Sequence, residues 1–223
     1  MGPQPVSVST AQRLEGELRR AIVALELRPG LRLSEADVAV RHGVSRQPAR
    51  EALQGLARTR LVQTLPQRGT VVAKISVPHI LQARFVREAV EAAVVERACV
   101  SFDRGARERI DGLLALQLRF AEADDHASFQ RYDQAFHVAL CEGAGCPLAW
   151  EALRDIKSHT DRLCQLTIPD RAAMLPLVDQ HRTIIAAIDA RDADAAAAAM
   201  RHHLGEILRA LPRVEAEHPE LFE

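Results

Sequence analysis

Three histidines and one aspartate in the second half of the chain have the residue types and spacing of metal ligands. Asp133 and His137 are four residues apart, so on a helix they share one face and can hold one ion. His181 falls on the apolar face of a second predicted helix, and in the pair His202-His203 the helical period turns only His203 toward the apolar side of a third. A single histidine on an apolar face is usually a hydrogen-bonded core residue. Four ligands that converge in a low-dielectric core favour a bound cation.

The donor set leaves the metal and its purpose open. Neutral imidazoles and a carboxylate suit Zn²⁺, Ni²⁺, Mn²⁺ or Fe²⁺, and the sequence does not choose among these divalent transition metals. A metal with an open position can activate water, so a metal-dependent hydrolase that uses the three histidines and the aspartate is one alternative. The chain has no HExxH-type helix and no evident dedicated general base, which argues against a hydrolase. A purely structural metal is the other alternative.

A basic helix in the first third of the chain has side chains suited to DNA. Ser45 can cap a helix from Arg46 to about Arg58, and Arg46, Gln47 and Arg50 project near its N-terminus. At that end, side chains can reach base edges in the major groove while backbone N–H groups hold a phosphate. A lone basic helix is more often just a solvated surface, so the interpretation depends on the elements around it.

Those elements predict a winged helix-turn-helix. Two helices meet at a tight turn that contains Gly43, the second helix is basic, and a hairpin follows it. Arg68 and Gly69 at the hairpin tip would allow close approach to the DNA backbone or the minor groove. The predicted elements are a helix from residue 9 or 10 to before Pro29, helices over 35–42 and 46–58, and strands over 61–65 and 70–73.

The remainder of the chain predicts an antiparallel helical bundle. A linker at Ser76-Val77-Pro78 precedes about six stretches with helical periodicity and no strand pattern. We therefore expect a mainly α protein with two domains, a winged helix-turn-helix over 1–75 and an all-helical domain over 76–223. The helical stretches are 78–101, 105–123, 125–143, 147–167, 171–190 and 192–211.

Charge and hydropathy separate the two domains and indicate a cytoplasmic protein. Residues 1–75 hold 12 basic and 6 acidic residues, a net charge of +6, and the rest hold 17 and 24, a net charge of −7. Only the first part is thus suited to a polyanion. No stretch is long and apolar enough to cross a bilayer, and the N-terminus lacks the pattern of a signal peptide.

The first domain resembles the GntR family of bacterial regulators. The resemblance rests on PGLRLSE at Pro29–Glu35, VSRQPAREAL at Val44–Leu53 and the wing sequence RGTVV at Arg68–Val72. Arg60 departs from the pattern, because members commonly have glycine before Leu-Val. We expect the turn from helix to strand to differ slightly there, with no DNA-contacting position affected.

The second domain resembles the FCD ligand-binding domain of the FadR subfamily. Its metal-binding members have Asp, three residues, then His, and two later histidines on separate helices; Asp133, His137, His181 and His203 match this order and spacing. The segment Asp179-Gln180-His181-Arg182 stands where members usually have Glu-His-Arg. About six helices resemble the VanR-type subgroup more than the seven-helix FadR type.

The resemblance implies a small organic acid as effector, whose carboxylate fills the open positions on the metal. Arg87 and Arg162 are candidates to meet the acid, because a guanidinium matches a carboxylate in a bidentate fork. For either arginine the surface is the commoner location. His159 falls on an inner helix face and is a candidate to line the pocket.

These observations predict a sequence-specific transcriptional regulator rather than an enzyme. One recognition helix reads only a few base pairs, so we expect a homodimer on palindromic operator double-stranded DNA. We expect repression controlled by the organic acid, and no membrane partner.

Overall fold

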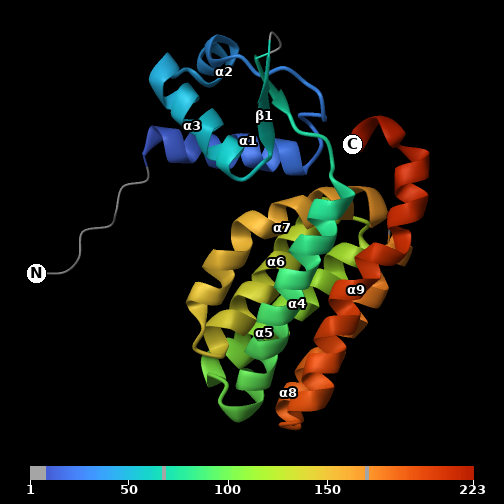
Figure 1. Ribbon diagram of the computed structural model, residues 1–223. Coiled ribbons are helices and arrows are strands. Elements are labelled where there is room, and N and C mark those ends of the chain that lie inside the picture. The colour runs from blue at the N-terminus through green and yellow to red at the C-terminus, as the bar shows by residue number, and fades with distance from the viewer. Residues whose placement is uncertain (1–8, 67–68, 169–170) are drawn as a thin grey trace, which may run out of the picture. The chain divides into compact units, whose positions relative to one another are not determined.

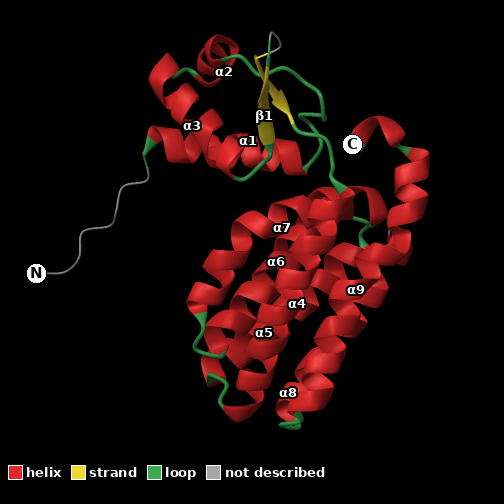
Figure 2. Cartoon of the chain, viewed as in Figure 1, coloured by secondary structure: helices red, strands yellow, loops and turns green. Residues whose placement is uncertain are grey.

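The computed structural model describes residues 9–66, 69–168 and 171–223 of the chain. The chain divides into two compact units, seen as a ribbon in Figure 1 and by secondary structure in Figure 2. The first unit extends to Val77 and also includes His218–Glu223, and the second comprises Pro78–Glu217.

The first unit has the elements of a winged helix-turn-helix. Helix α2 begins after Ser34, whose hydroxyl accepts from the N–H of Asp37 at 3.0 Å, and it ends at Gly43 in the left-handed conformation, at φ +63°. The two strands pair antiparallel with Val62 opposite Val72 and form the wing. The elements are α1 (Thr10–Val23), α2 (Glu35–His42), α3 (Arg46–Arg58), β1 (Val62–Leu65) and β2 (Gly69–Val72).

One apolar face of α3 anchors the recognition helix. Ala49, Ala52 and Leu56 have no exposed surface and pack with Leu14 and Ile22 of α1. Complete burial of a leucine or isoleucine side chain contributes about 1.5–3 kcal/mol. The opposite face of α3 is therefore held outward by the core beneath it.

Helix α1 ends earlier than its apolar spacing predicts. The helix stops at Val23, before Pro29 as predicted, but Leu25, the last apolar position assigned to it, lies beyond its end with a left-handed backbone at φ +59°. Leu27 lies outside the helix, but its N–H donates to the carbonyl of Ala21 at 3.0 Å and its side chain is buried. The apolar positions continued because the loop after the helix packs on the same core.

The turn from α3 to β1 places Arg60 in a conformation that favours glycine. Its φ is +59°, its N–H donates to the carbonyl of Ala57, and Leu61 then donates to Leu56. A residue with a Cβ is strained in this left-handed region by about 1 kcal/mol. Arg60 therefore occupies, with some strain, the turn position at which members commonly have glycine.

The C-terminal tail belongs to the first unit. Ile75 donates its N–H to the carbonyl of Leu221 at 2.9 Å, and Glu223 donates to the carbonyl of Ile75 at 3.1 Å. Ile75 and Phe222 form a parallel bridge, and each is only 2% exposed. The division at residue 75 placed this tail in the second domain, and the structure differs because a bridge between two short segments leaves no periodicity in the sequence.

Six helices make up the described part of the second unit. Helix α5 packs on α6 and α8, α7 packs on α6 and α9, and α8 packs on α9. No helix among the described residues is long and apolar enough to span a bilayer. The helices are α4 (Val77–Val100), α5 (Arg104–Glu122), α6 (His126–Gly143), α7 (Pro147–Thr167), α8 (Arg171–Asp189) and α9 (Ala193–Glu217).

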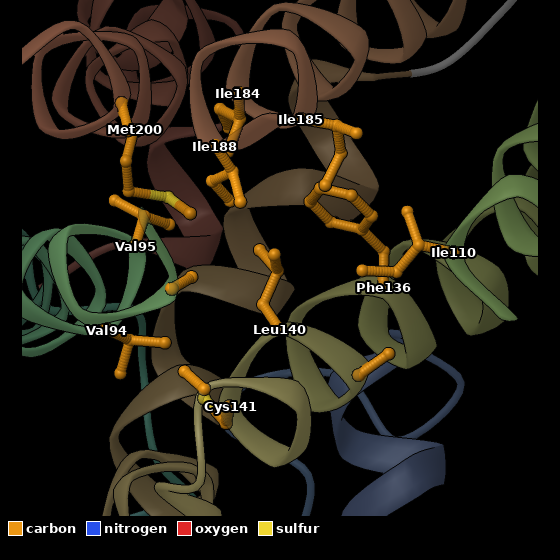
Figure 3. Close-up of a cluster of buried hydrophobic side chains, with 14 of the residues drawn as sticks. Val94, Val95, Ile110, Phe136, Leu140, Cys141, Ile184, Ile185, Ile188 and Met200 are labelled. Atoms are coloured by element: carbon orange, nitrogen blue, oxygen red, sulfur yellow. The ribbon is translucent and has the colours of Figure 1, made fainter. Parts of the chain in front are cut away.

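The core of this unit fixes the faces on which polar residues point inward. Figure 3 shows Phe136 and Leu140 of α6 packed toward Ile184 and Ile185 of α8. Met200 of α9 joins the same cluster. Each of these three helices therefore turns one fixed face to the centre of the bundle.

Candidate metal centre and DNA-binding surface

The four predicted metal ligands meet inside the helical unit. Asp133 and His137 come from α6, His181 from α8 and His203 from α9, and one ligand atom of each lies within 4.8 Å of all the others. The Nε2 atom of His203 is 3.2 Å from that of His181 and 3.4 Å from that of His137, and Asp133 Oδ1 is 3.6 Å from His181 Nε2. The three rings are 0–8% exposed. Donor atoms around one tetrahedral or octahedral ion lie about 3.0–3.4 Å apart, so these separations fit a shared cation.

A hydrogen-bond acceptor holds the outer nitrogen of two of these rings. Gln117 Oε1 lies 2.7 Å from Nδ1 of His181, and Gln180 Oε1 lies 3.0 Å from Nδ1 of His203. Gln117 is itself oriented, since its Nε2 donates to the carbonyl of Tyr132 at 3.1 Å. These acceptors put the ring proton on Nδ1 and leave the Nε2 lone pair facing the other rings.

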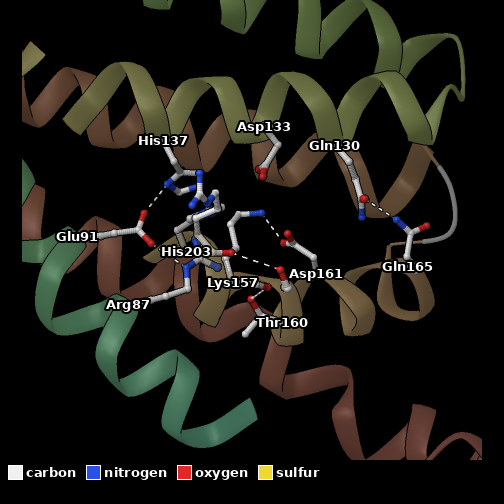
Figure 4. Close-up of polar contacts among 12 residues, drawn as sticks. Arg87, Glu91, Gln130, Asp133, His137, Lys157, Thr160, Asp161, Gln165 and His203 are labelled. Atoms are coloured by element: carbon white, nitrogen blue, oxygen red, sulfur yellow. Dashed lines mark hydrogen bonds and ion pairs between the residues drawn. The ribbon is translucent and has the colours of Figure 1, made fainter. Parts of the chain in front are cut away.

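The third ring is held by an ion pair. Glu91 Oε2 lies 2.5 Å from His137 Nδ1, and Glu91 Oε1 accepts from Nε of Arg87 at 2.7 Å (Figure 4). Burial raises the pKa of Glu91, but Arg87 and His137 outweigh it and hold that pKa below its ordinary value. A carboxylate bound to the outer nitrogen raises the basicity of a ligand ring.

Electrostatics keep two of the rings neutral. Burial lowers the pKa of His181 well below its ordinary value, and His137 lowers it further. Burial likewise lowers the pKa of His203, with His181 adding to the effect. Neutral rings with converging lone pairs repel one another unless a cation lies between them, so the donor set fits a metal ion.

The candidate DNA-binding residues lie on one exposed surface of the first unit. Ser45, Arg46, Gln47 and Arg50 are all exposed at the N-terminal end of α3. Ser45 occupies the N-cap position, but its side chain makes no capping hydrogen bond, which differs from the expectation that it caps the helix.

Two contacts hold side chains of this surface. Arg50 donates from Nε and its terminal nitrogen to the two carboxylate oxygens of Glu35 at 3.0 and 3.1 Å, and Gln47 donates to Glu51 at 2.8 Å. The hydrogen bond from Arg50 lowers the pKa of Glu35. At the wing, Gly69 has φ +72°, and Arg68 lies outside the described residues.

Comparison with known proteins finds one family match in each of the two units. Residues 10–72 match the family model of bacterial regulatory proteins of the gntR family, and residues 82–206 match the FCD domain. The chain is 36% identical over 219 residues to the HTH-type transcriptional repressor RspR of Escherichia coli strain K12, covering 98% of this chain and 94% of that one. The chain belongs to the GntR family.

Solved structures show the same fold. This GntR regulator is similar to E. coli McbR/YncC with a TM-score of 0.78 at 20% identity, over 95% of this chain and 99% of that one. A GntR regulator from Rhodococcus sp. RHA1 has a TM-score of 0.75 at 26% identity, over 92% and 97% of the two chains. The protein is accordingly a transcriptional regulator and not an enzyme, and the hydrolase alternative is left without support.

The three residues predicted to meet an effector of this GntR regulator have different environments. Arg87 and Arg162 are 8% and 1% exposed, so neither has the surface location that arginine commonly has. Burial lowers the pKa of Arg162 to about 10. His159 is half-buried and stacks on His79 near the start of α4, with 5.6 Å between ring centroids. Of the three, Arg87 is the residue that the described contacts join to the ligand cluster.

Sequence reasoning missed the residues that orient the metal ligands. Gln117 has no exposed surface within the apolar face of α5, a signal that a buried amide must have a polar partner. Glu91 lies four residues after Arg87 on a largely apolar helix, the spacing of an ion pair. The distinction between neighbouring histidines was correct, because His203 is buried and His202 is exposed.

Proposed function

We propose that this GntR regulator represses transcription by binding operator DNA as a homodimer, and that a small carboxylate bound at a metal in the FCD domain controls its DNA affinity. The observation that carries the proposal is the convergence of three Nε2 atoms, each 3.2–3.4 Å from the next along the series His181, His203, His137. This donor set suits Zn²⁺, Ni²⁺, Mn²⁺ and Fe²⁺ and does not select one of them.

Asp133, His137, His181 and His203 would hold the ion. A divalent cation there supplies positive charge and open positions that a carboxylate can occupy. Arg87 contacts Glu91, which in turn contacts the metal ligand His137. An acid bound at the metal therefore enters a region already rich in fixed charge. Binding there can favour one arrangement of α6, α8 and α9 over another.

DNA recognition is assigned to the exposed end of α3. Ser45, Arg46, Gln47 and Arg50 would enter the major groove, and Arg68 and Gly69 at the wing would contact the backbone or the minor groove. The bidentate pair between Arg50 and Glu35 joins α3 to the start of α2. A DNA base and the Glu35 carboxylate would compete for the same guanidinium N–H donors of Arg50.

The homodimer is supported by apolar side chains that the FCD domain leaves exposed. Leu81 and Phe85 of α4 are 48% and 71% exposed and stand four residues apart, on one face of the helix. Exposed apolar patches commonly mark an interface between protein chains. A twofold dimer also doubles the number of bases read, on a palindromic site in the cytoplasm.

Operator binding measured with and without metal and acids tests this function. The protein is loaded with Zn²⁺ or dialysed against a chelator, and its affinity for a DNA fragment upstream of the neighbouring operon is measured with a panel of organic acids. An acid that weakens binding of the metal-loaded dimer, and is not consumed, supports the proposal. A metal that stabilises the fold while no acid changes DNA affinity indicates a purely structural metal, and consumption of an acid indicates an enzyme.

A further inference from the structure

A row of polar side chains extends from the metal ligands along the interface of α6 and α7. On α6, Gln130 and Asp133 precede His137 by seven and four residues, so the three share one face. Across from them on α7, Lys157 and Asp161 are also four residues apart. Figure 4 shows the row of side chains between the two helices, from His137 at one end to Gln130 at the other.

Contacts within the row leave some of its hydrogen-bonding capacity unused. Lys157 is only 6% exposed and contacts Asp161, and Gln165 donates to Gln130 Oε1 at 2.5 Å. The other end of that amide, Gln130 Nε2, is buried and has no hydrogen-bond partner among the described residues. A buried N–H without an acceptor is costly, and natural proteins seldom leave one unless something else binds it.

The chemistry of the row matches a chain of hydroxyl groups. Asp133 and Asp161 accept hydrogen bonds, whereas Lys157 and Gln130 Nε2 donate them. A hydroxyl both donates and accepts, so neighbouring hydroxyls can satisfy groups of both kinds, whereas an alkyl chain would leave all of them unpaired. Asp161 already neutralises Lys157, so beyond the metal the row offers no unpaired positive charge to a second carboxylate, which argues against a dicarboxylic acid.

The length of the row sets the size of the ligand. Seven helical residues separate His137 from Gln130, a rise of about 10 Å. An acid coordinated at the metal must therefore extend by about four to six carbons before its last hydroxyl reaches Gln130 within hydrogen-bond distance. A two- or three-carbon acid would end beside Asp133 and would not reach the amides of Gln130 and Gln165.

We infer that the effector is a polyhydroxylated monocarboxylic acid, of the sugar-acid class. Its carboxylate lies at the metal and its hydroxyl chain follows the row, with Gln130 Nε2 donating to a distal hydroxyl. The inference rests on the proposed function for the binding of the carboxylate at the metal. The preference for a hydroxylated chain is the new part, and it follows from the polar row alone.

Calorimetry on the full-length, Zn²⁺-loaded protein tests the inference. The ligands are a panel of four- to six-carbon aldonic acids that includes gluconate, with hexanoate as the acid of equal length without hydroxyls and lactate as the short acid. We expect at least one aldonate to bind at least about tenfold more tightly than hexanoate, because each unpaired polar group in the row disfavours the alkyl chain. If no aldonate exceeds hexanoate, the inference is wrong.

A pair of matched variants locates the preference. Gln130→Leu should lower the affinity for the tightest-binding aldonate about tenfold and leave lactate affinity and metal content unchanged. Gln134→Leu makes the same substitution four residues further along α6, at an exposed position, and should change nothing. Equal aldonate affinity in the two variants would overturn the assignment of Gln130.

The two proposals fail in different ways. If lactate binds the metal-loaded protein and aldonates gain nothing over it, the sugar-acid inference fails and the proposed function stands. If neither lactate, hexanoate nor any aldonate binds, the proposed carboxylate control fails as well.

Discussion

The Nε2 atoms of His181 and His203 lie 3.2 Å apart, and the outer nitrogen of each ring faces the side-chain oxygen of a glutamine. Because the glutamines hold the ring protons at Nδ1, neither ring can donate to the other. Two lone pairs thus face each other in a buried place, an arrangement that a cation between them stabilises. The glutamines are therefore part of the site although they touch no ligand atom.

Replacing one of these glutamines should weaken metal binding without removing a metal ligand. Gln117→Met keeps the length of the side chain and removes the oxygen that faces His181, so we expect metal affinity to fall about 10–100-fold. A competition titration with a chromogenic chelator measures the loss. Gln134→Met, exposed on α6, is the control, and equal affinities in the two variants would show that Gln117 does not orient the ring.

The exposed end of α3 should determine operator affinity. Arg46→Ala and Arg50→Ala should each reduce binding to the operator by about ten- to a hundredfold, with a smaller effect on unrelated DNA, if they contact base edges. Fluorescence anisotropy with both DNAs measures the two losses. Arg104→Ala removes an exposed arginine of α5 and should leave operator affinity unchanged.

The wing should contribute in a different manner. Arg68→Ala should weaken binding to all DNA sequences to a similar extent and reduce the salt dependence of binding, as expected for a phosphate contact. A loss confined to the operator would instead make Arg68 a base-reading residue. Unchanged operator affinity of the Arg46→Ala/Arg50→Ala double variant would exclude α3 as the recognition helix.

Much of the fold could be predicted because its signals are local. Helices α2 and α3 have the predicted bounds since Ser34, Gly43 and the apolar period of α3 act within a few residues of each other. The FCD helices follow the predicted stretches for the same reason, apart from α9, which continues to Glu217 instead of ending near residue 211. The tail bridge at Phe222 escaped prediction because it joins segments far apart in the sequence and is too short to show periodicity.

The candidate site was predictable only in its innermost part. Histidines and an aspartate on apolar faces are rare enough to stand out, so the ligand cluster was found from spacing alone. Glu91 and Gln180 lie among ordinary helix-forming residues, and their role depends on which helices pack together. The polar row that ends at Gln130 likewise emerges only when α6 and α7 are placed face to face.

A glycine at residue 60 should stabilise the turn after α3. Arg60→Gly relieves the left-handed strain at φ +59°, and we expect the free energy of unfolding to rise by about 0.5–1 kcal/mol after the entropy of glycine is counted. Chemical denaturation measures the change. Gly43→Ala makes the opposite change at φ +63° and should destabilise by a similar amount. A destabilised Arg60→Gly protein would mean that contacts of the arginine outweigh the strain.

The C-terminal tail should stabilise the DNA-binding unit. Phe222→Ala removes a ring that is 2% exposed and packs in the first unit, so we expect a loss of about 3 kcal/mol in the free energy of unfolding of that unit. Hydrogen exchange at the N–H of Ile75 reports the effect locally, because that group donates to the tail. Leu148→Ala, at a side chain 72% exposed, is the control, and equal protection in both variants would show that the tail is dispensable.

The metal content of two neighbouring histidine variants tests the central claim most directly. His203 is buried among the ligand atoms, whereas His202 is exposed on the same helix and contributes no atom to the cluster. After dialysis against a weak chelator, elemental analysis should find about one transition-metal ion per chain in the wild type and in His202→Ala, and almost none in His203→Ala. Equal metal content in the two variants would contradict the metal centre, and with it the proposed control of DNA binding.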